Sequence, residues 1–309
     1  MIRSLSAISL GFSGFQSKAG DQVKTGLVFS VLIATLGQGT APVGVSAQDA
    51  PKNAPPANEE AAKDVAARRR VELDELKQAA ASYRIAMDSD QPENAVLVPE
   101  PVLHWSNPLR QTSNGAVFIW VADGRPEVVA SLYRYTFGGK LIEDHEFQSL
   151  ATIGLTATRN GQSVWAPPNA GVSLIPIPGA ARPAATSTER LRQMQALARE
   201  FHAFFDTTDN KSELRLLPKP LYRYETKNPG LGDGALFAFV VTTDPEVLLM
   251  IEARPIGGEL VWHYGFARMS MVNLRAQHKD QTVWNADWVY DLEAPNKPYV
   301  TLRAPDRIH

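Results

Sequence analysis

The sequence predicts an α+β protein built as a tandem duplication, in which each copy is one amphipathic helix followed by a curved antiparallel β-meander of about five strands. Residues 97–165 align with residues 216–284 at a constant offset of 119 positions without a gap, and nineteen of the 69 pairs are identical. Unrelated stretches of ordinary composition share about four. Each block alternates apolar runs with turn residues and follows a segment whose apolar residues recur at helical spacing. A repeat of this length indicates two copies of one folding unit.

The residues that both copies keep are mainly turn residues, prolines at the start of strands, and aromatic residues. The identical pairs include Pro99/Pro218, Gly115/Gly234, Phe118/Phe237, the tripeptides Pro126–Val128 and Pro245–Val247, Gly138–Gly139 and Gly257–Gly258, and Val164–Trp165 and Val283–Trp284.

The first 47 residues are predicted to be a signal peptide that is cleaved after Ala47. Lys18 and Lys24 precede the apolar run Leu27–Leu36, and small residues then lead to the cleavage site. A run of about ten apolar residues is too short to span a bilayer comfortably. The alternative is an uncleaved membrane anchor, because the basic region before the run is long. The chain has no cysteine, which for an exported protein favours a bacterial envelope and a periplasmic or secreted location.

The charge of the chain argues against general binding of nucleic acid. The formal net charge is −2. Removal of residues 1–47 takes away Arg3, Lys18, Lys24 and Asp21, a net of +2, which leaves −4. Nucleic-acid binding needs a basic face. No second apolar run approaches transmembrane length, so no stable membrane span is expected after removal of the signal.

The rest of the chain divides at changes of composition. Residues 48–58 (QDAPKNAPPAN) cannot bury apolar surface and are predicted to form a disordered linker. The first helix-plus-meander unit is expected at residues 59–175. A Pro/Gly-rich connector follows at 176–185, and the second unit covers 186–309.

Each unit begins with a predicted helix. The first helix is expected from Glu59 to Met87, and a plausible capping box at Thr186–Glu189 starts the second. The apolar residues of the first helix follow one another at steps of 3, 4, 3 and 4, and those of the second lie 118 positions later. They are Leu73, Leu76, Ala80, Tyr83 and Met87, and then Leu191, Met194, Ala198, Phe201 and Phe205.

The strands are predicted in equivalent pairs, and Tyr299–Arg303 is expected to add an edge strand. Val128, Ala130 and Leu132 share one strand face, which we assign to the core. The strand before it, Ala116–Val121, is apolar on both faces. Its second face must therefore also be buried, and the other copy of the unit is the expected packing partner. The two copies would then pack with pseudo-twofold symmetry as an intramolecular pseudo-dimer. The predicted pairs are Pro101–Trp105 and Pro220–Tyr224, Ala116–Val121 and Ala235–Val241, Glu127–Tyr135 and Glu246–Arg254, Lys140–Leu150 and Glu259–Met269, and a last hairpin ending at Trp165 and Trp284.

Glu127 and Glu246, in the shared Pro-Glu-Val tripeptide, are the first candidates for a polar site. They would be two equivalent carboxylates if they were functional. The preferred interpretation is that each glutamate is exposed beside a proline at the first residue of a strand.

Asp144-His145-Glu146 is the second candidate, and His263 is the residue 119 positions after Asp144. A strand points consecutive side chains to opposite faces, so at most Asp144 and Glu146 converge. The preferred interpretation is a solvated strand face. No histidine lies at the spacing of a metal motif, and no nucleophile-elbow pattern is present. We therefore assign no catalytic residue, no cofactor-binding residue and no metal ligand, and we expect no cofactor.

Two long blocks resemble a family of uncharacterised exported proteins of planctomycete bacteria. These are GAVFIWVADGRPEVVASLYRY and the segments RLRQMQALAREF, LRLLPKPLYRYE and DGALFAFVVTTDPEVLLMIEAR. The resemblance covers most of residues 65–290 and implies export, but it brings no activity with it. The helix followed by a curved meander is also similar in outline to NTF2-like or cystatin-like units, which says little about function.

The sequence leaves three functions open. The leading hypothesis is an exported, non-catalytic binding or interaction module whose partner is an unknown ligand or an envelope protein. The first alternative is a hydrolase or other small-molecule enzyme with a site in only one of the two copies. The second is a structural envelope component that uses its edge strands.

Overall fold

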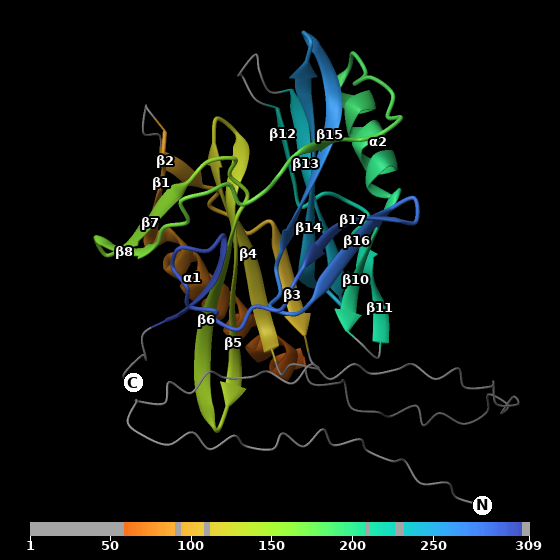
Figure 1. Cartoon of the computed structure of the whole chain (residues 1–309). Helices are drawn as coiled ribbons and strands as arrows, with labels where there is room; N and C mark the ends of the chain where they lie inside the picture. Colours follow the sequence, from red (N-terminus) through yellow and green to blue (C-terminus); the bar gives the residue numbers. More distant parts are fainter. Residues whose placement is uncertain (1–58, 90–93, 108–111, 208–209, 226–231, 305–309) are drawn as a thin grey trace, which may run out of the picture. The chain divides into compact units, whose positions relative to one another are not determined.

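The computed structural model describes residues 59–89, 94–107, 112–207, 210–225 and 232–304, which all belong to one compact unit (Figure 1). The predicted signal peptide with Ala47, and the predicted linker at 48–58, lie outside the described residues. The described chain is mixed but mostly β, with two helices and two curled sheets. None of the helices in these ranges is both long enough and apolar enough to cross a membrane.

The first sheet has the strand order β18-β6-β5-β4-β2-β1-β7-β8, with β3 beside β4. Helix α1 (Glu59–Ala81) precedes it. Its strands are β1 (Tyr83–Met87), β2 (Asn94–Leu97), β3 (Leu103–Asn107), β4 (Thr112–Ala122), β5 (Arg125–Phe137), β6 (Lys140–Ser149), β7 (Leu155–Arg159), β8 (Gln162–Trp165) and β18 (Tyr299–Arg303).

The second sheet has the order β17-β16-β10-β11-β13-β14-β15-β9, with β12 beside β13. Helix α2 (Ser187–Ala198) precedes most of it. Its strands are β9 (Ile175–Pro176), β10 (Phe201–Thr207), β11 (Asn210–Leu216), β12 (Tyr222–Glu225), β13 (Asp233–Val241), β14 (Asp244–Ile256), β15 (Glu259–Arg268), β16 (Leu274–His278) and β17 (Gln281–Ala286).

The two sheets have the same internal order, but neither is a simple meander. Consecutive strands pair from β3 to β6 and from β12 to β15, but β2 pairs with β4 and β11 pairs with β13. The last hairpin, β7–β8, pairs with β1 instead of β6. The expectation of about five sequential strands was therefore wrong, because each sheet has nine strands. Strand β2 is only four residues long, too short for alternation to predict it.

The predicted first helix was too long at its C-terminal end. It stops at Ala81, and Tyr83–Met87 forms strand β1, with Tyr83, Ile85 and Met87 buried. Positions four apart share a face in a helix and in a strand alike, so the step from Tyr83 to Met87 does not distinguish the two. The predicted second helix was too long as well. Helix α2 ends at Ala198, and Phe201 and Phe205 lie in β10, because their spacing of four also fits both a helix and a strand.

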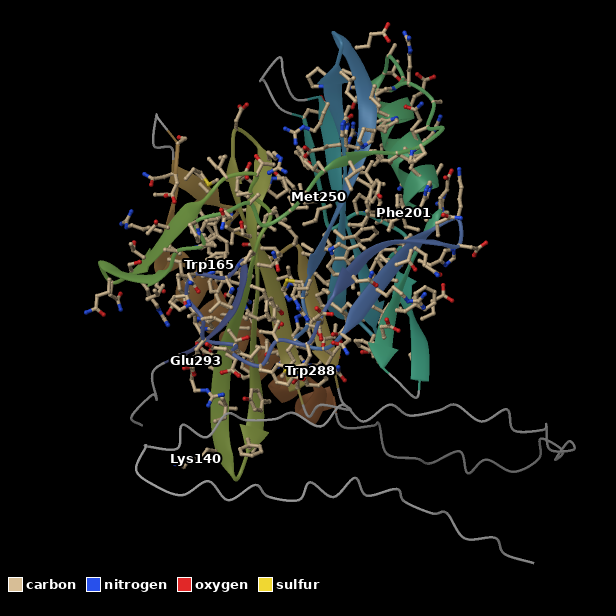
Figure 2. All side chains as sticks on the ribbon, in the orientation of Figure 1. Lys140, Trp165, Phe201, Met250, Trp288 and Glu293 are labelled. Atoms are coloured by element: carbon tan, nitrogen blue, oxygen red, sulfur yellow. The ribbon has the colours of Figure 1, made fainter. Side chains whose placement is uncertain are left out.

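Each face of the first sheet packs against a different partner. Val128, Ala130 and Leu132 form a core with Leu76 and Ala80 of α1, which is the predicted core face. The opposite face packs against the second sheet in a separate core, in which Figure 2 labels Met250. This core includes pairs of residues 119 positions apart: Val117 and Leu236, Ile119 and Ala238, and Val129 and Leu248.

The outer edges of the two long hairpins are covered by strands from the other half of the chain. The expected edge strand Tyr299–Arg303 is present as β18, but it pairs with β6 of the first sheet. Strand β9, in the segment after the first sheet, pairs with β15 of the second sheet. The segment that follows each sheet thus crosses to the opposite one, which ties the two together through backbone hydrogen bonds.

Glycines in β4 and β13 lie under aromatic rings of the neighbouring strand. Trp105 pairs with Gly115, and a Cβ on that glycine would lie 2.1 Å from Trp105 Cε2. Tyr224 pairs with Gly234, where a Cβ would lie 2.3 Å from Tyr224 Cζ. The identical glycines of the two copies are therefore required by close packing of a ring on the backbone.

Candidate functional site

The six residues that the sequence marked as candidates for a polar site are all buried, and they do not form one site. The expected exposed positions of Glu127 and Glu246, and the expected solvated face of Asp144-His145-Glu146, were therefore wrong. His263 is also buried, and its Nδ1–H donates to the carbonyl of Val261 at 2.9 Å. Buried charges require partners, and the structure shows them for Glu127, Asp144, His145 and Glu146.

Glu127 belongs to a cluster between the two sheets that is centred on Arg125. The Arg125 guanidinium donates to Glu127 at 2.8 Å and to Glu252 of the second sheet at 3.0 Å. The Tyr224 hydroxyl donates to the same Glu252 oxygen at 2.6 Å. Arg125 is only 4% exposed. This cluster joins the sheets across their shared core.

The ionisation of the Arg125 cluster follows from its burial. Burial raises the pKa of Glu127 to about 7, although Arg125 beside it favours the carboxylate. Burial alone would lower the pKa of Arg125, but Glu127 and Glu252 outweigh that effect and raise it. The pKa of the Tyr224 hydroxyl is also well above its usual value because it is buried beside Glu252. The positive charge of Arg125 is therefore balanced within the cluster by Glu127 and Glu252.

Asp144 and Glu146 point to one face of β6 and bind residues of β18. The Tyr135 hydroxyl and Arg303 donate to Asp144 at 2.9 and 3.0 Å. The Tyr299 hydroxyl donates to Glu146. These contacts hold the C-terminal strand on the first sheet.

His145 points to the opposite face and takes part in a chain of polar contacts under α1. Its Nδ1 lies 2.7 Å from the Tyr83 hydroxyl, and its Nε2 lies 3.0 Å from Glu143. Glu143 accepts a bond from Arg134 at 2.6 Å, and Arg134 also pairs with Glu75 of α1. Sequence reasoning missed Glu143, although it lies two residues before His145 on the same strand face.

The Tyr83–His145–Glu143 arrangement has the order of a nucleophile, base and orienting acid, but its protonation is that of a structural network. A nucleophile is activated by a lowered pKa or by an adjacent base whose pKa lies near the working pH. Burial raises the pKa of Tyr83 to about 12 and lowers the pKa of His145. The pKa of Glu143 falls to about 2, because the bonds from His145 and Arg134 outweigh its burial. We therefore assign this chain of contacts to the packing of α1 on the sheet.

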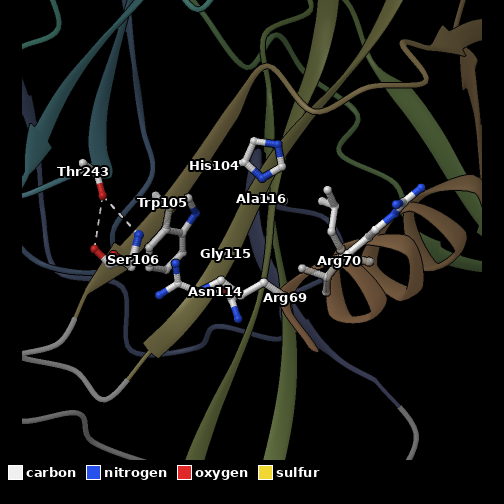
Figure 3. Close-up of a pocket in the computed structure, with 11 residues that line it drawn as sticks. Arg69, Arg70, His104, Trp105, Ser106, Asn114, Gly115, Ala116 and Thr243 are labelled. Atoms are coloured by element: carbon white, nitrogen blue, oxygen red, sulfur yellow. Dashed lines mark hydrogen bonds between the residues drawn. The ribbon is translucent and has the colours of Figure 1, made fainter. Parts of the chain in front are cut away.

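A pocket of about 460 Å³ opens between α1, β3 and β4 (Figure 3). This volume is within the usual range of small-molecule sites. Arg69 and Arg70 of α1 lie at its rim, and both are exposed. In the described parts of the chain, no carboxylate forms an ion pair with either arginine. The remaining lining residues are Leu73, Leu76, His104, Trp105, Ser106, Asn114, Gly115, Ala116 and Thr243.

One wall of the pocket comes from the second sheet. The Thr243 hydroxyl, in the turn between β13 and β14, accepts from the Ser106 N–H at 3.1 Å and donates to the Ser106 carbonyl at 3.2 Å. The Asn114 amide donates to Glu72 of α1. The pocket thus combines cations, amide and hydroxyl groups with an apolar floor.

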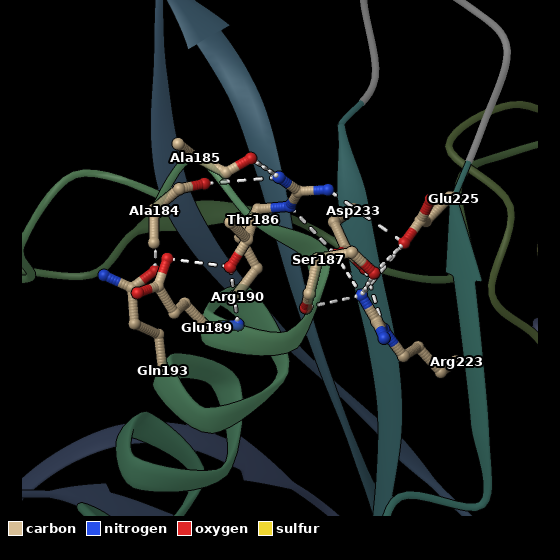
Figure 4. A network of polar contacts seen from close by, with 10 residues as sticks. All are labelled: Ala184, Ala185, Thr186, Ser187, Glu189, Arg190, Gln193, Arg223, Glu225 and Asp233. Carbon is tan, nitrogen blue, oxygen red and sulfur yellow. Dashed lines mark hydrogen bonds and ion pairs between the residues drawn. The ribbon is translucent and has the colours of Figure 1, made fainter.

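In the second half of the chain, an ion-pair network joins α2, β12 and β13 (Figure 4). Asp233 begins β13, and its side chain is fully buried. It accepts from Arg190 of α2 at 2.9 Å and from Arg223 of β12 at 3.2 Å. Arg223 also donates to Glu225 at 3.0 Å. The bond to Asp233 is the main reason that the pKa of Arg223 is raised.

A second pocket of about 420 Å³ lies beside β10 and β11. His202 and Glu213 in its lining pair with each other at 2.6 Å. Searching the described residues for three or more His, Asp or Glu side chains that could hold a metal ion finds none. Comparison with protein-family models, curated proteins and solved structures finds no match in any of the three.

Proposed function

We propose that the chain is a tandem duplication of one helix-and-sheet unit, whose copies pack with pseudo-twofold symmetry as an intramolecular pseudo-dimer. The equal strand orders of the two sheets support this proposal. So do the aromatic rings over Gly115 and Gly234, and the reciprocal exchange of β9 and β18. Backbone turns agree as well: φ is positive at Asp123 and Thr242, which are 119 positions apart.

In this proposal the protein is an exported, periplasmic or secreted binding module without catalytic activity. The open pocket beside α1 carries the argument, because the place that matches it in the second copy is closed by ion pairs. The charged residues in the interior are used to hold the sheets and helices together, so they are not available for chemistry. The pocket is then the place where the first copy meets a partner.

An enzyme confined to the first copy is the second candidate, favoured by His104 and Ser106 in the same pocket. The Ser106 backbone is bound to Thr243, and no contact between the Ser106 hydroxyl and His104 is present in the described residues. A serine nucleophile needs a base within hydrogen-bond reach. This separation favours binding over hydrolysis.

A titration followed at the indole N–H of Trp105, which lines the pocket, tests the binding function. The signal is assigned by its loss in Trp105→Phe, and small probes of different charge are added to the ¹⁵N-labelled protein. Saturable shifts of this signal, with every probe recovered unchanged, support a binding module. Conversion of a probe, lost in His104→Ala, would favour the enzyme. Absence of any shift argues against both.

Export has an independent test. The predicted signal peptide implies that the mature protein begins near Gln48. Mass spectrometry of the protein recovered from the producing cell measures that N-terminus. A mature chain that still begins at Met1 contradicts cleavage.

A further inference from the structure

We propose that the pocket beside α1 binds a carboxylate group through Arg69 and Arg70 at its rim. This inference rests on the proposed duplication and binding function, and it names the chemical class of the ligand.

The groups that close the second copy have counterparts of different charge in the first. Asp233 corresponds to Asn114 at the offset of 119, so a buried carboxylate is replaced by a neutral amide. Glu225 corresponds in the same way to Ser106.

The arginines differ as well. Arg190 corresponds at offset 118 to Glu72, which accepts from the Asn114 amide, and Arg223 corresponds at offset 119 to His104. The ion-pair network of the second copy is therefore absent from the first.

Two arginines of the first copy have no charged counterpart in the second. Arg69 and Arg70 lie at offset 118 from Ser187 and Thr188, which are uncharged. In the second copy Ser187 donates to Glu225 at 2.5 Å, so this part of the helix already faces a carboxylate there. Arginine side chains bind carboxylates through paired, charge-assisted hydrogen bonds. Two exposed arginines without an acidic partner among the described residues are placed to bind one supplied from outside.

The floor of the pocket indicates what is attached to the carboxylate. Leu73, Leu76 and Ala116 line the pocket together with Trp105, whose ring covers Gly115. A volume of about 460 Å³ is larger than one carboxylate needs. The ligand class is therefore a carboxylic acid with an apolar chain, either free or as the acidic side chain or C-terminus of a peptide.

Four probes of equal chain length test this inference: hexanoate, hexyl phosphate, 1-hexanol and hexylamine. Each is titrated into the full protein while the Trp105 indole signal is followed. We expect hexanoate to bind at least about tenfold more tightly than hexanol or hexylamine, because one charge-assisted bond contributes about 1.4 kcal/mol or more. A peptide ending in a free carboxylate, compared with its C-terminal amide, separates a peptide ligand from a free acid.

Charge-reversal variants place the site. Arg69→Glu/Arg70→Glu is expected to weaken hexanoate binding by at least about tenfold. The matched control, Arg84→Glu/Arg192→Glu, changes two exposed arginines outside the pocket and should leave binding within about twofold. Asn114→Asp, which adds a second carboxylate beside Glu72 in the wall of the pocket, should weaken hexanoate binding by charge repulsion.

Each result decides a separate claim. Equal binding of hexanoate and hexanol, or an equal loss in the control variant, overturns the carboxylate inference. Binding of hexyl phosphate alone also overturns it but leaves the proposed binding function standing. If no probe shifts the signal in a protein with unchanged urea unfolding, the inference and the binding function both fail.

Discussion

Arg125→Met is expected to reduce the free energy of unfolding by about 3 kcal/mol at pH 7, because it removes the buried arginine that pairs with both Glu127 and Glu252. Removing one partner of a buried ion pair costs about 3–5 kcal/mol. The side chains of Arg125 and Glu252 are 4% and 2% exposed, which places this pair in the buried class.

Two features of the cluster put the expected loss at the lower end of that range. After Arg125 is gone, Glu252 keeps its 2.6 Å bond from the Tyr224 hydroxyl and its ion pair with the half-buried Arg254 at 3.4 Å. Glu127, whose pKa is already about 7, takes up a proton and avoids an unpaired buried charge. The penalty therefore comes mainly from Glu252 and from the lost bond to the Leu150 carbonyl at 3.1 Å.

Urea unfolding followed by tryptophan fluorescence measures this change. The exposed Arg84→Met serves as the control and should change the free energy by less than about 0.5 kcal/mol. Arg125→Met/Glu252→Gln should recover part of the loss, because it removes the buried charge left behind. A loss below about 1 kcal/mol in Arg125→Met, or no recovery in the double variant, would refute the view that this cluster holds the sheets together.

Three further predictions concern other buried contacts. Burial raises the folded-state pKa of Glu127 from 4.5 to about 7, so its contribution is complete below about pH 4.5 and is lost as the pH rises through 7. Glu127→Gln should therefore match the wild type at pH 4.5 and exceed its unfolding free energy by up to about 3 kcal/mol at pH 8, measured by urea unfolding; a constant difference contradicts this. Gly115→Ala should lower the melting temperature, with a cost of about 1–3 kcal/mol, because the new Cβ meets the Trp105 ring at 2.1 Å; an unchanged melting temperature contradicts the ring packing. Asp233→Asn should cost about 3 kcal/mol, because two arginines lose their buried acid, and added acetate should restore part of it. Acetate should leave the wild type unaffected, and equal stabilisation of both proteins contradicts the role of Asp233.

The sequence predicted the parts of the fold that depend on local pattern and on the repeat. The long hairpins around Gly138–Gly139 and Gly257–Gly258, and the edge strand Tyr299–Arg303, are present where they were expected. Their turns need glycine or another residue at positive φ, which leaves a clear local signal. The pairing of β1 with β7 joins segments about 70 residues apart, and no local pattern specifies it.

The burial of these charged residues was not predicted, because some of their partners are far away in the sequence. Glu127 pairs with Arg125, which lies two residues earlier on the same strand face. This contact could have been predicted from the alternation of a strand. Glu252 comes from the other sheet, and only the packed structure brings it there. A glutamate beside a proline at the start of a strand is otherwise expected to face water.

The pocket was not predicted for a different reason, because the residues that the two repeats share do not indicate it. The positions that define it are those at which the copies differ, such as Asn114 against Asp233 and Ser106 against Glu225. A difference in charge between aligned positions is a usable signal once the offset is known. Such a difference indicates which copy forms its own ion pairs beside the helix and which copy has an open pocket there.

The proposed tandem pseudo-dimer would also explain how one copy can be closed while the other stays open. In a symmetric homodimer a substitution appears in both subunits, so closing one pocket closes the other. In a single chain the two copies change independently. The contacts that hold the sheets together, such as Val117 and Leu236 in the shared core, have remained apolar in both. The places beside the helices are free to diverge, because each contacts only its own helix and the turn of the opposite sheet. Under the proposed duplication, Asp233 and its two arginines stabilise the second copy from within, and the first copy keeps the equivalent place for a ligand.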